Sequence, residues 1–267
     1  MRRIDDLFVR LATEKRKALV AYLCVGDPSV DESIELALAC GEAGADVLEL
    51  GVPFSDPTAD GPAIARASQR AIANGSSLSE TLRAAKAIRA RTSAPIVLFG
   101  YYNPLFVRGD ERVVRDAAEA GVDAFLVVDL PQDEGAELRA AAAANGLSMI
   151  PLVAPTSAPS RIEAIGRAKP KAPFIYYVSV TGVTGSQAAP LVQASEEAAA
   201  VKRVAGAPIV VGFGIDSPAK ARDAAKHTDG VVVGTAIVKA IEDGPTAQAR
   251  KAAVRDLVRS LRTALDA

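Results

Sequence analysis

The feature that most constrains this chain is a regular repeat of short, strongly apolar segments separated by longer stretches with helical patterning. Eight segments rich in Val, Ile, Leu and Phe are predicted strands: residues 19–25, 46–50, 96–100, 124–128, 149–153, 174–179, 209–213 and 231–234. Their starts lie about 30 residues apart, which is the size of one strand–helix–strand repeat. Strands that are apolar on both faces are typical of a parallel sheet covered by helices.

Helix boundaries are predicted between these segments. Ser29 with Glu32, and Ser77 with Glu80, have the spacing of a capping box at a helix start. Four glycines follow helical patterns and are predicted to end them: Gly44, Gly75, Gly121 and Gly146. The last helical stretch carries one apolar stripe, so it is expected to pack on the body of the protein.

Eight such repeats predict an α/β fold, a (β/α)8 TIM barrel with an additional N-terminal helix. No Pro-, Gly- or Ser-rich linker divides the chain, so residues 1–267 are expected to form a single domain. Sites in this fold lie in the loops that follow the strands. An open doubly wound sheet is the alternative, but the first strand is followed by Val25-Gly26-Asp27-Pro28 rather than by the glycine fingerprint of that fold.

Composition narrows the possible functions and the location. The 31 Lys and Arg residues are balanced by 32 Asp and Glu residues, so binding to a nucleic acid or to an anionic membrane surface is not expected. Cys24 and Cys40 are too few for a disulfide framework, which favours a reducing compartment. No run reaches the about 18 apolar residues of a membrane span, and no signal peptide is recognised. We therefore expect a soluble, cytoplasmic protein.

Glycine-containing turns follow the last three predicted strands, at residues 182–185, 212–215 and 234–235. Glycine lets the backbone approach a ligand closely, and amide groups at a helix start bind anions. The loops after strands seven and eight form a common phosphate site in this barrel. These turns therefore predict a phosphorylated small-molecule ligand, although tight turns that need a positive φ would look the same.

Two acidic residues are candidates for proton transfer. Glu49 ends an apolar strand, where burial raises the pKa of a carboxyl group toward neutrality. Asp60 lies in the proline-rich loop 53–62 that follows. The alternatives are that Glu49 is a structural acid and that Asp60 caps the helix that begins at Pro62. Three other acids near strand ends fit turn or capping roles better: Asp27, Asp56 and Asp129.

Several other chemistries are disfavoured by the sequence. His227 is the only histidine, which argues against a Ser-His-Asp relay and against histidine metal sites, so no metal is expected. No lysine lies in a predicted strand, which argues against a Schiff-base aldolase in the barrel core. Acid/base catalysis by carboxyl groups is what remains.

Several motifs resemble those of the tryptophan synthase alpha chain family, nearly from end to end of the chain. The most specific is ELGVPFSDP at residues 49–57, followed by ADGP at 59–62. The others are GDP at 26–28, YYN at 101–103, DLP at 129–131, GVTG at 182–185, GFGI at 212–215 and GTAIVK at 234–239.

This resemblance implies a lyase of tryptophan biosynthesis that cleaves indole-3-glycerol phosphate, by a retro-aldol reaction, to indole and glyceraldehyde 3-phosphate. It implies that Glu49 is the general acid/base and that Asp60 accepts the indole N–H. The indole ring takes up the electrons once its C3 is protonated, so no cofactor is implied in this chain. A partner beta chain carrying pyridoxal phosphate is implied, in an alpha2beta2 heterotetramer.

The same resemblance implies substrate contacts. Residues implied at the phosphate are Gly185, Gly214, Gly234 and Thr235. Tyr176 is implied beside Glu49, and Thr184 is implied to meet Asp60 when the loop 182–190 closes. Residues implied around the indole are Tyr22, Phe99, Leu126, Phe213 and Val232, of which Leu126 and Val232 fit an ordinary core role equally well. Loops 53–60 and 186–190 are implied to face the partner. Thr235 departs from the serine usual in the family, and residues 186–190 lack a basic residue that many relatives have.

Two other functions are open at this point. One is a phosphate-binding barrel isomerase or epimerase that uses Glu49 with Asp129. The other is a catalytically silent subunit that activates a partner, although the presence of Glu49, Asp60 and the glycine turns counts against it.

Overall fold

The computed structural model describes residues 2–131, 134–178, 191–212 and 214–267. Its strands are parallel and lie in the order β5-β4-β3-β2-β1-β9-β8-β7-β6. Their bounds are β1 (Ala18–Cys24), β2 (Val47–Gly51), β3 (Ile96–Gly100), β4 (Ala124–Val127), β5 (Ser148–Met149), β6 (Leu152–Val153), β7 (Ile175–Val178), β8 (Ile209–Gly212) and β9 (Gly230–Val233).

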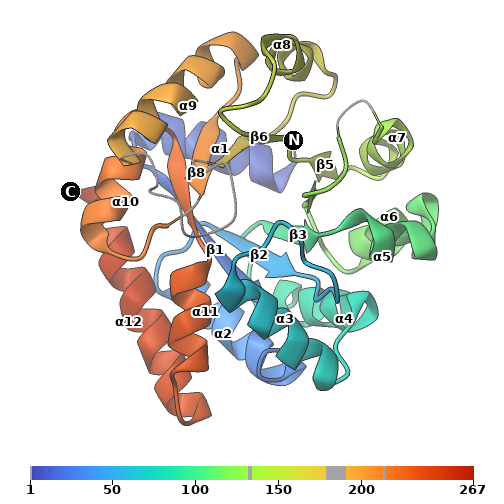
Figure 1. The fold of residues 1–267 in the computed structure, drawn as a ribbon, viewed down its shortest axis with the longest axis vertical. Coiled ribbons are helices and arrows are strands. Elements are labelled where there is room, and N and C mark those ends of the chain that lie inside the picture. Colours follow the sequence, from blue (N-terminus) through green and yellow to red (C-terminus); the bar gives the residue numbers. More distant parts are fainter. Residues whose placement is uncertain (1, 132–133, 179–190, 213) are drawn as a thin grey trace.

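Helices surround these strands (Figure 1). Their bounds are α1 (Arg3–Glu14), α2 (Val30–Glu42), α3 (Pro62–Ala73), α4 (Leu78–Arg89), α5 (Tyr102–Arg108), α6 (Asp110–Glu119), α7 (Ala136–Ala144), α8 (Pro159–Arg167), α9 (Leu191–Ala205), α10 (Pro218–Ala225), α11 (Thr235–Glu242) and α12 (Ala247–Asp266). In the described part of the chain, none of these helices combines the length and apolarity needed to span a bilayer.

One short segment closes the sheet into a barrel. β5 and β6 are separated only by Ile150 and Pro151. The amide of Ile150 donates to the carbonyl of Phe125 on one side, and the carbonyl of Pro151 accepts from the amide of Tyr176 on the other. The predicted barrel is therefore confirmed, but its fifth strand is split in two, because Pro151 has no N–H to give to a ladder and the segment changes neighbours there.

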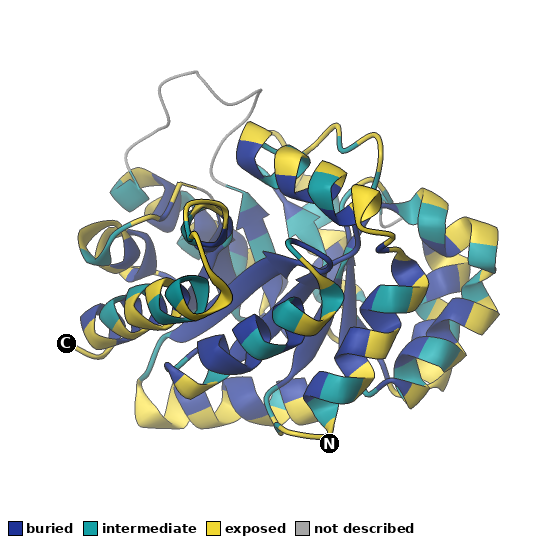
Figure 2. Ribbon diagram, turned by 90° about the horizontal axis from the view of Figure 1, so that it is seen from below, coloured by how far each residue is buried: buried dark blue, intermediate teal, exposed yellow. Residues whose placement is uncertain are grey.

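The core has two layers, which follow from the alternation of side chains along each strand. Inward-facing residues such as Val20, Val47 and Leu126 form the interior cluster, and outward-facing residues such as Leu19 and Leu48 pack under the helices. Figure 2 shows the result, with dark blue strands inside and helices that are yellow only on their outer faces.

The predicted N-terminal helix is α1, and it covers the amino-terminal end of the barrel. Its buried residues Ile4, Leu7, Phe8 and Leu11 join the interior cluster. The ring of Phe8 lies 5.1 Å from that of Phe174, which directly precedes β7. The barrel interior is thus sealed at this end, so a ligand must enter from the carboxyl ends of the strands.

Three aspartates at the amino-terminal end of the barrel each bind an amide of a neighbouring strand segment. The pairs are Leu19 N–Asp46 at 2.9 Å, Ile96 N–Asp123 at 2.8 Å and Ile209 N–Asp229 at 2.8 Å. Each carboxylate also has a cationic partner, in the pairs Arg262–Asp46 at 3.0 Å, Arg89–Asp123 at 2.8 Å and Lys202–Asp229 at 2.6 Å. These acids are therefore fully engaged in holding successive strands in register.

Most predicted helix ends are confirmed. Ser29 caps α2 by accepting a hydrogen bond from the amide of Glu32 at 3.2 Å, although the carboxylate of Glu32 pairs with Arg250 and does not complete the capping box. The predicted terminating glycines all have a positive φ, at 109° for Gly44, 79° for Gly75, 80° for Gly121 and 76° for Gly146. The capping box at Ser77 is wrong, because its side chain makes no capping bond and Glu80 pairs with Arg83 instead.

Candidate active site

Glu49 lies inside the open end of the barrel. It is in β2, in register with Tyr22 of β1 and Val97 of β3, and its neighbours Leu48 and Leu50 point outward to the helices. Only 1% of Glu49 is exposed, and within the described residues its Oε1 has no hydrogen-bond partner. Burial raises the pKa of this carboxyl to about 8. Glu49 is therefore protonated at neutral pH and can give up that proton.

Asp60 lies in the loop before α3. The N-cap residue of α3 is Gly61, and no side chain caps that helix, so the alternative role of Asp60 as a cap is wrong. Burial raises the pKa of Asp60 to about 6, while a hydrogen bond from Tyr101 acts in the opposite direction. At neutral pH Asp60 is thus mostly ionised, whereas Glu49 is mostly protonated, and acids that differ in this way can take different roles.

Tyr101 is a site residue that the sequence analysis named only as part of a motif. Its hydroxyl accepts from the amide of Ala59 at 2.9 Å and bonds to Asp60. Its ring stacks on Phe54 at 5.1 Å between centroids. Tyr101 therefore fixes both ends of the turn that presents Asp60.

Two tyrosines lie within the electrostatic reach of both acids. Tyr22 is buried and Tyr176 is half-buried. Desolvation raises the pKa of each well above its usual value, and the charges of Glu49 and Asp60 act on both in the same direction. The ring of Tyr22 meets that of Phe99 edge-on at 5.2 Å. The predicted residues Glu49, Asp60, Tyr22, Phe99 and Tyr176 are therefore brought to one opening.

Glycines make room for these rings. A Cβ at Gly51 would lie 2.5 Å from the hydroxyl of Tyr22, and one at Gly212 would lie 2.2 Å from that of Tyr176. Leu126 and Val232 are buried in the interior cluster beneath the opening. Their position is that of a floor, so their core role is observed and their contact with a ligand stays a prediction.

Two of the predicted phosphate residues, Gly234 and Thr235, lie at the start of a helix. Thr235 is the first residue of α11 and Gly234 is its N-cap, while Gly214 has a φ of +70° in the turn before α10. A Cβ at Gly234 would lie 3.2 Å from Tyr22, so this helix start borders the aromatic opening. Amide groups at such a start attract an anion. Thr184, Gly185 and Phe213 lie outside the described residues.

The remaining acids near strand ends have structural partners. Asp129 accepts the amide of Tyr102 at 2.7 Å, at the start of α5. Both oxygens of Asp27 bind Arg70 at 2.8 Å. Asp56 is exposed and accepts from Ser55. Asp129 thus has the capping role that its position predicted, and none of the contacts described here joins it to Glu49, so they give the isomerase alternative no support.

A closed parallel barrel with a protonated and an ionised carboxyl at one opening, bordered by an anion-attracting helix start, defines a (β/α)8 enzyme that acts by acid/base catalysis on a small phosphorylated substrate. A family model described as "Tryptophan synthase alpha chain" matches residues 8–266. The chain belongs to this family, whose reaction is the cleavage of indole-3-glycerol phosphate to indole and glyceraldehyde 3-phosphate, and it is accordingly a lyase of tryptophan biosynthesis. The family works with a beta chain.

Similar proteins support this assignment. The tryptophan synthase alpha chain of Citrifermentans bemidjiense is 50% identical over 245 residues, which is 91% of this chain and 90% of that one. That of Geotalea daltonii is 47% identical over 91% of both chains. The solved alpha subunit from Legionella pneumophila str. Paris superimposes with a TM-score of 0.92 at 34% identity, covering 100% of this chain and 99% of that one.

Proposed function

We propose that Glu49 and Asp60 divide the work of the family's reaction. The carboxyl of Glu49 donates its proton to C3 of the indole ring, which leaves a positive charge centred on the ring nitrogen. The carboxylate of Asp60 accepts the N–H and stabilises that charge. The different pKa values of the two acids support this assignment, since each begins in the protonation state that its role requires.

The second half of the reaction returns the proton. The carboxylate of Glu49 now takes the proton of the glycerol hydroxyl, and the O–H electrons form the carbonyl of the aldehyde. The bond between C3 and the glycerol carbon breaks, and its electron pair restores the aromatic indole. Glu49 ends protonated, as it began. No cofactor in this chain is needed, because the indole ring itself holds the electrons.

Substrate placement follows from the same opening. We assign the phosphate to the amides of Gly214, Gly234 and Thr235 and to the Thr235 hydroxyl, and the indole to the space between Tyr22 and Phe99. We place Tyr176 beside Glu49, above the floor formed by Leu126 and Val232. Thr184, Gly185 and Phe213 complete the proposed site on the strength of the sequence motifs alone.

We assign the beta-chain surface to the face that carries this opening. Phe106 and Val107 of α5, 65% and 78% exposed, follow β3 at its carboxyl end, on the same side as the loop at 53–60. Exposed apolar side chains close together are typical of a protein interface. We infer an alpha2beta2 assembly in the cytoplasm, with pyridoxal phosphate on the beta chain, and a single domain spanning residues 1–267.

The single observation that carries this proposal is the buried carboxyl of Glu49, whose Oε1 has no hydrogen-bond partner among the described residues. Its test is indole release from indole-3-glycerol phosphate by the purified chain, with and without a beta chain. Glu49→Gln should lower the rate by about 100-fold or more, since it cannot relay a proton. Glu119→Gln, at an exposed helix end, is the matched control. Equal rates for wild type and Glu49→Gln would refute the assignment.

A further inference from the structure

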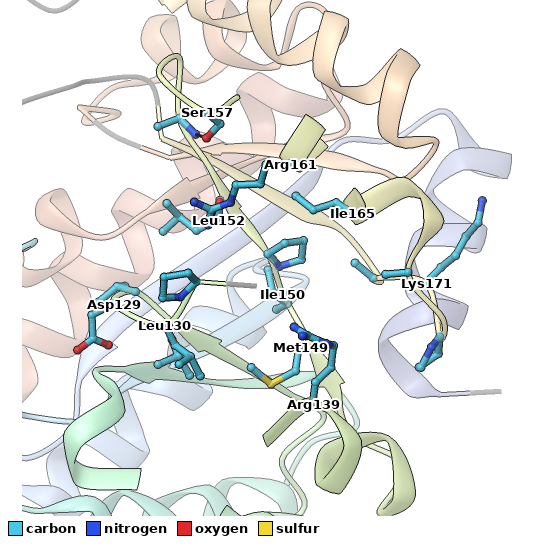
Figure 3. Close-up of a pocket in the computed structure, with 18 of the residues that line it drawn as sticks. Asp129, Leu130, Arg139, Met149, Ile150, Leu152, Ser157, Arg161, Ile165 and Lys171 are labelled. Atoms are coloured by element: carbon cyan, nitrogen blue, oxygen red, sulfur yellow. Dashed lines mark hydrogen bonds between the residues drawn. The ribbon is translucent and has the colours of Figure 1, made fainter. Parts of the chain in front are cut away.

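A cavity, which we call the outer pocket, lies between α7 and α8 at the segment 148–153 that closes the sheet (Figure 3). It has a volume of about 460 Å³. Met149 of its lining packs under the helices, whereas Ile150 and Leu152 pack with the interior cluster. Glu49, Asp60 and Tyr176 are not among the residues that line it. It is therefore separate from the proposed active site, and the family's reaction gives it no role.

The lining of this outer pocket combines an apolar floor with positive charge. Met149, Leu152 and Ile165 contribute to the floor, and the cations among the described lining residues are Arg2, Arg139, Arg161 and Lys171. The one acid among these lining residues, Asp129, is bound to the amide of Tyr102. Cations thus outnumber acids around an apolar surface, which is the pattern expected for a ligand with an apolar body and an anionic group.

Arg161 has a buried nitrogen, its Nε, that faces no acceptor among the described residues. One of its amino groups reaches the carbonyl of Leu152 at 3.5 Å, and no described carboxylate lies within ion-pair distance of it. Figure 3 shows its side chain extending from the start of α8 toward Leu152. The buried arginine Arg262, by contrast, is paired with Asp46 and Asp266. An acceptor from outside the chain would satisfy Arg161.

We propose that the outer pocket binds a small amphipathic anion, with an aromatic or other apolar body and one carboxylate, sulfonate or phosphate group. The anionic group accepts a hydrogen bond from Nε of Arg161, and the apolar body covers Met149, Leu152 and Ile165. The site is a second ligand site, independent of the acids in the barrel opening.

The test uses 8-anilinonaphthalene-1-sulfonate, an amphipathic anion whose fluorescence reports binding, on the full chain. Wild type should bind one saturable equivalent at the outer pocket. Arg161→Gln should weaken that binding about tenfold, as expected for loss of one charge-assisted hydrogen bond. Arg167→Gln, on the same helix but outside the pocket and paired with Glu163, is the matched control and should bind like wild type. N-phenyl-1-naphthylamine, which lacks the sulfonate, should bind wild type and Arg161→Gln equally.

A second variant keeps the test independent of Arg161. Ala143 is exposed on α7 and lines the pocket, so Ala143→Phe should block binding of the sulfonate while the arginine is still present. Indole release and thermal unfolding close to wild type would show that both variants are folded. Absence of saturable binding to wild type would overturn the proposal, and so would unchanged binding to folded Arg161→Gln and Ala143→Phe.

Discussion

Buried acids have different hydrogen-bonding surroundings at the two ends of this barrel. At the amino-terminal end, Asp123 is surrounded by donors: the amide of Ile96 and the guanidinium groups of Arg3 and Arg89. At the carboxyl end, Glu49 has an oxygen with no partner in the described part of the chain. A carboxylate that holds strands together therefore has hydrogen-bond donors around it. The carboxyl group that we propose transfers a proton has an oxygen without a donor among the described residues. The difference shows that local pairing, rather than burial alone, separates a structural acid from a reactive one.

The largest effect is expected at the paired end. Asp123→Ala should lower the free energy of unfolding by about 3–5 kcal/mol, because the buried amide of Ile96 loses its acceptor and Arg89 loses its carboxylate partner while keeping its bonds to backbone carbonyls. Urea unfolding measures this, with Asp256→Ala, at an exposed position of α12, as control. A loss no larger than that of the control would mean that these pairs do not hold the barrel together.

At the reactive end, Asp60→Asn should lower indole release about 100-fold, because a neutral amide cannot balance charge on the ring nitrogen. Stability should change little. Asp56→Asn, in the same loop and exposed, is the control for the isolated chain. If the Asp60 variant keeps a rate within threefold of wild type, its proposed role is wrong.

Removing Glu49, whose Oε1 has no partner among the described residues, should have the reverse effect on stability. Glu49→Leu should raise the free energy of unfolding by at least about 1 kcal/mol at pH 5, since a buried polar group without a partner is lost. The gain should grow toward pH 8, because the folded state of the wild type holds a proton up to its raised pKa while the unfolded state has released it. Unfolding of both proteins at the two pH values measures this, and a gain that shrinks with pH would contradict the raised pKa.

The pH dependence of catalysis sharpens the same contrast. Activity requires ionised Asp60 and protonated Glu49, with pKa values of about 6 and about 8. The value of kcat/KM should therefore be highest between these values and fall about tenfold per pH unit on either side. Rates from pH 5 to 9 test this, and Asp60→Asn should lose the acidic limb only.

The smallest effect is expected at the phosphate. Thr235→Ser keeps the hydroxyl at the start of α11 and removes one methyl group, so KM should change by no more than about threefold and kcat should not change. Thr246→Ser, at the N-cap of α12, is the control. A larger change in KM would show that the methyl group shapes the phosphate site.

Sequence patterns predicted features that depend on neighbours along the chain. The barrel followed from the spacing of apolar segments, and the burial of Glu49 followed from its place in one of them. The split of the fifth strand was missed, because Pro151 stands within an apolar run and only the change of partner strand reveals its effect. The aspartate–amide pairs were also missed, since Asp46 and Leu19 are 27 positions apart and meet only through strand register.

The proposed site was predicted to a similar extent. The acids could be found from their positions near strand ends, whereas the role of Tyr101 depends on contacts with Ala59 and Asp60 across about 40 residues of chain. The alternative of Asp60 as a helix cap could not be decided from sequence, because the distinction depends on whether Gly61 or Asp60 occupies the N-cap. The atoms of Glu49 and Arg161 that have no partner among the described residues could not be found from the sequence, because a missing partner is revealed only by positions in space.

The short segment that closes the barrel has a consequence for how this protein would aggregate. A closed ring has no edge strand to offer to another molecule, which protects it from intermolecular pairing. Here residues 148–153 pair with β4 on one side and with β7 on the other. Loosening that segment would therefore expose an edge of each of these two strands. Partial opening at this point would create two unprotected pairing surfaces at once, and aggregation under mild stress should begin there.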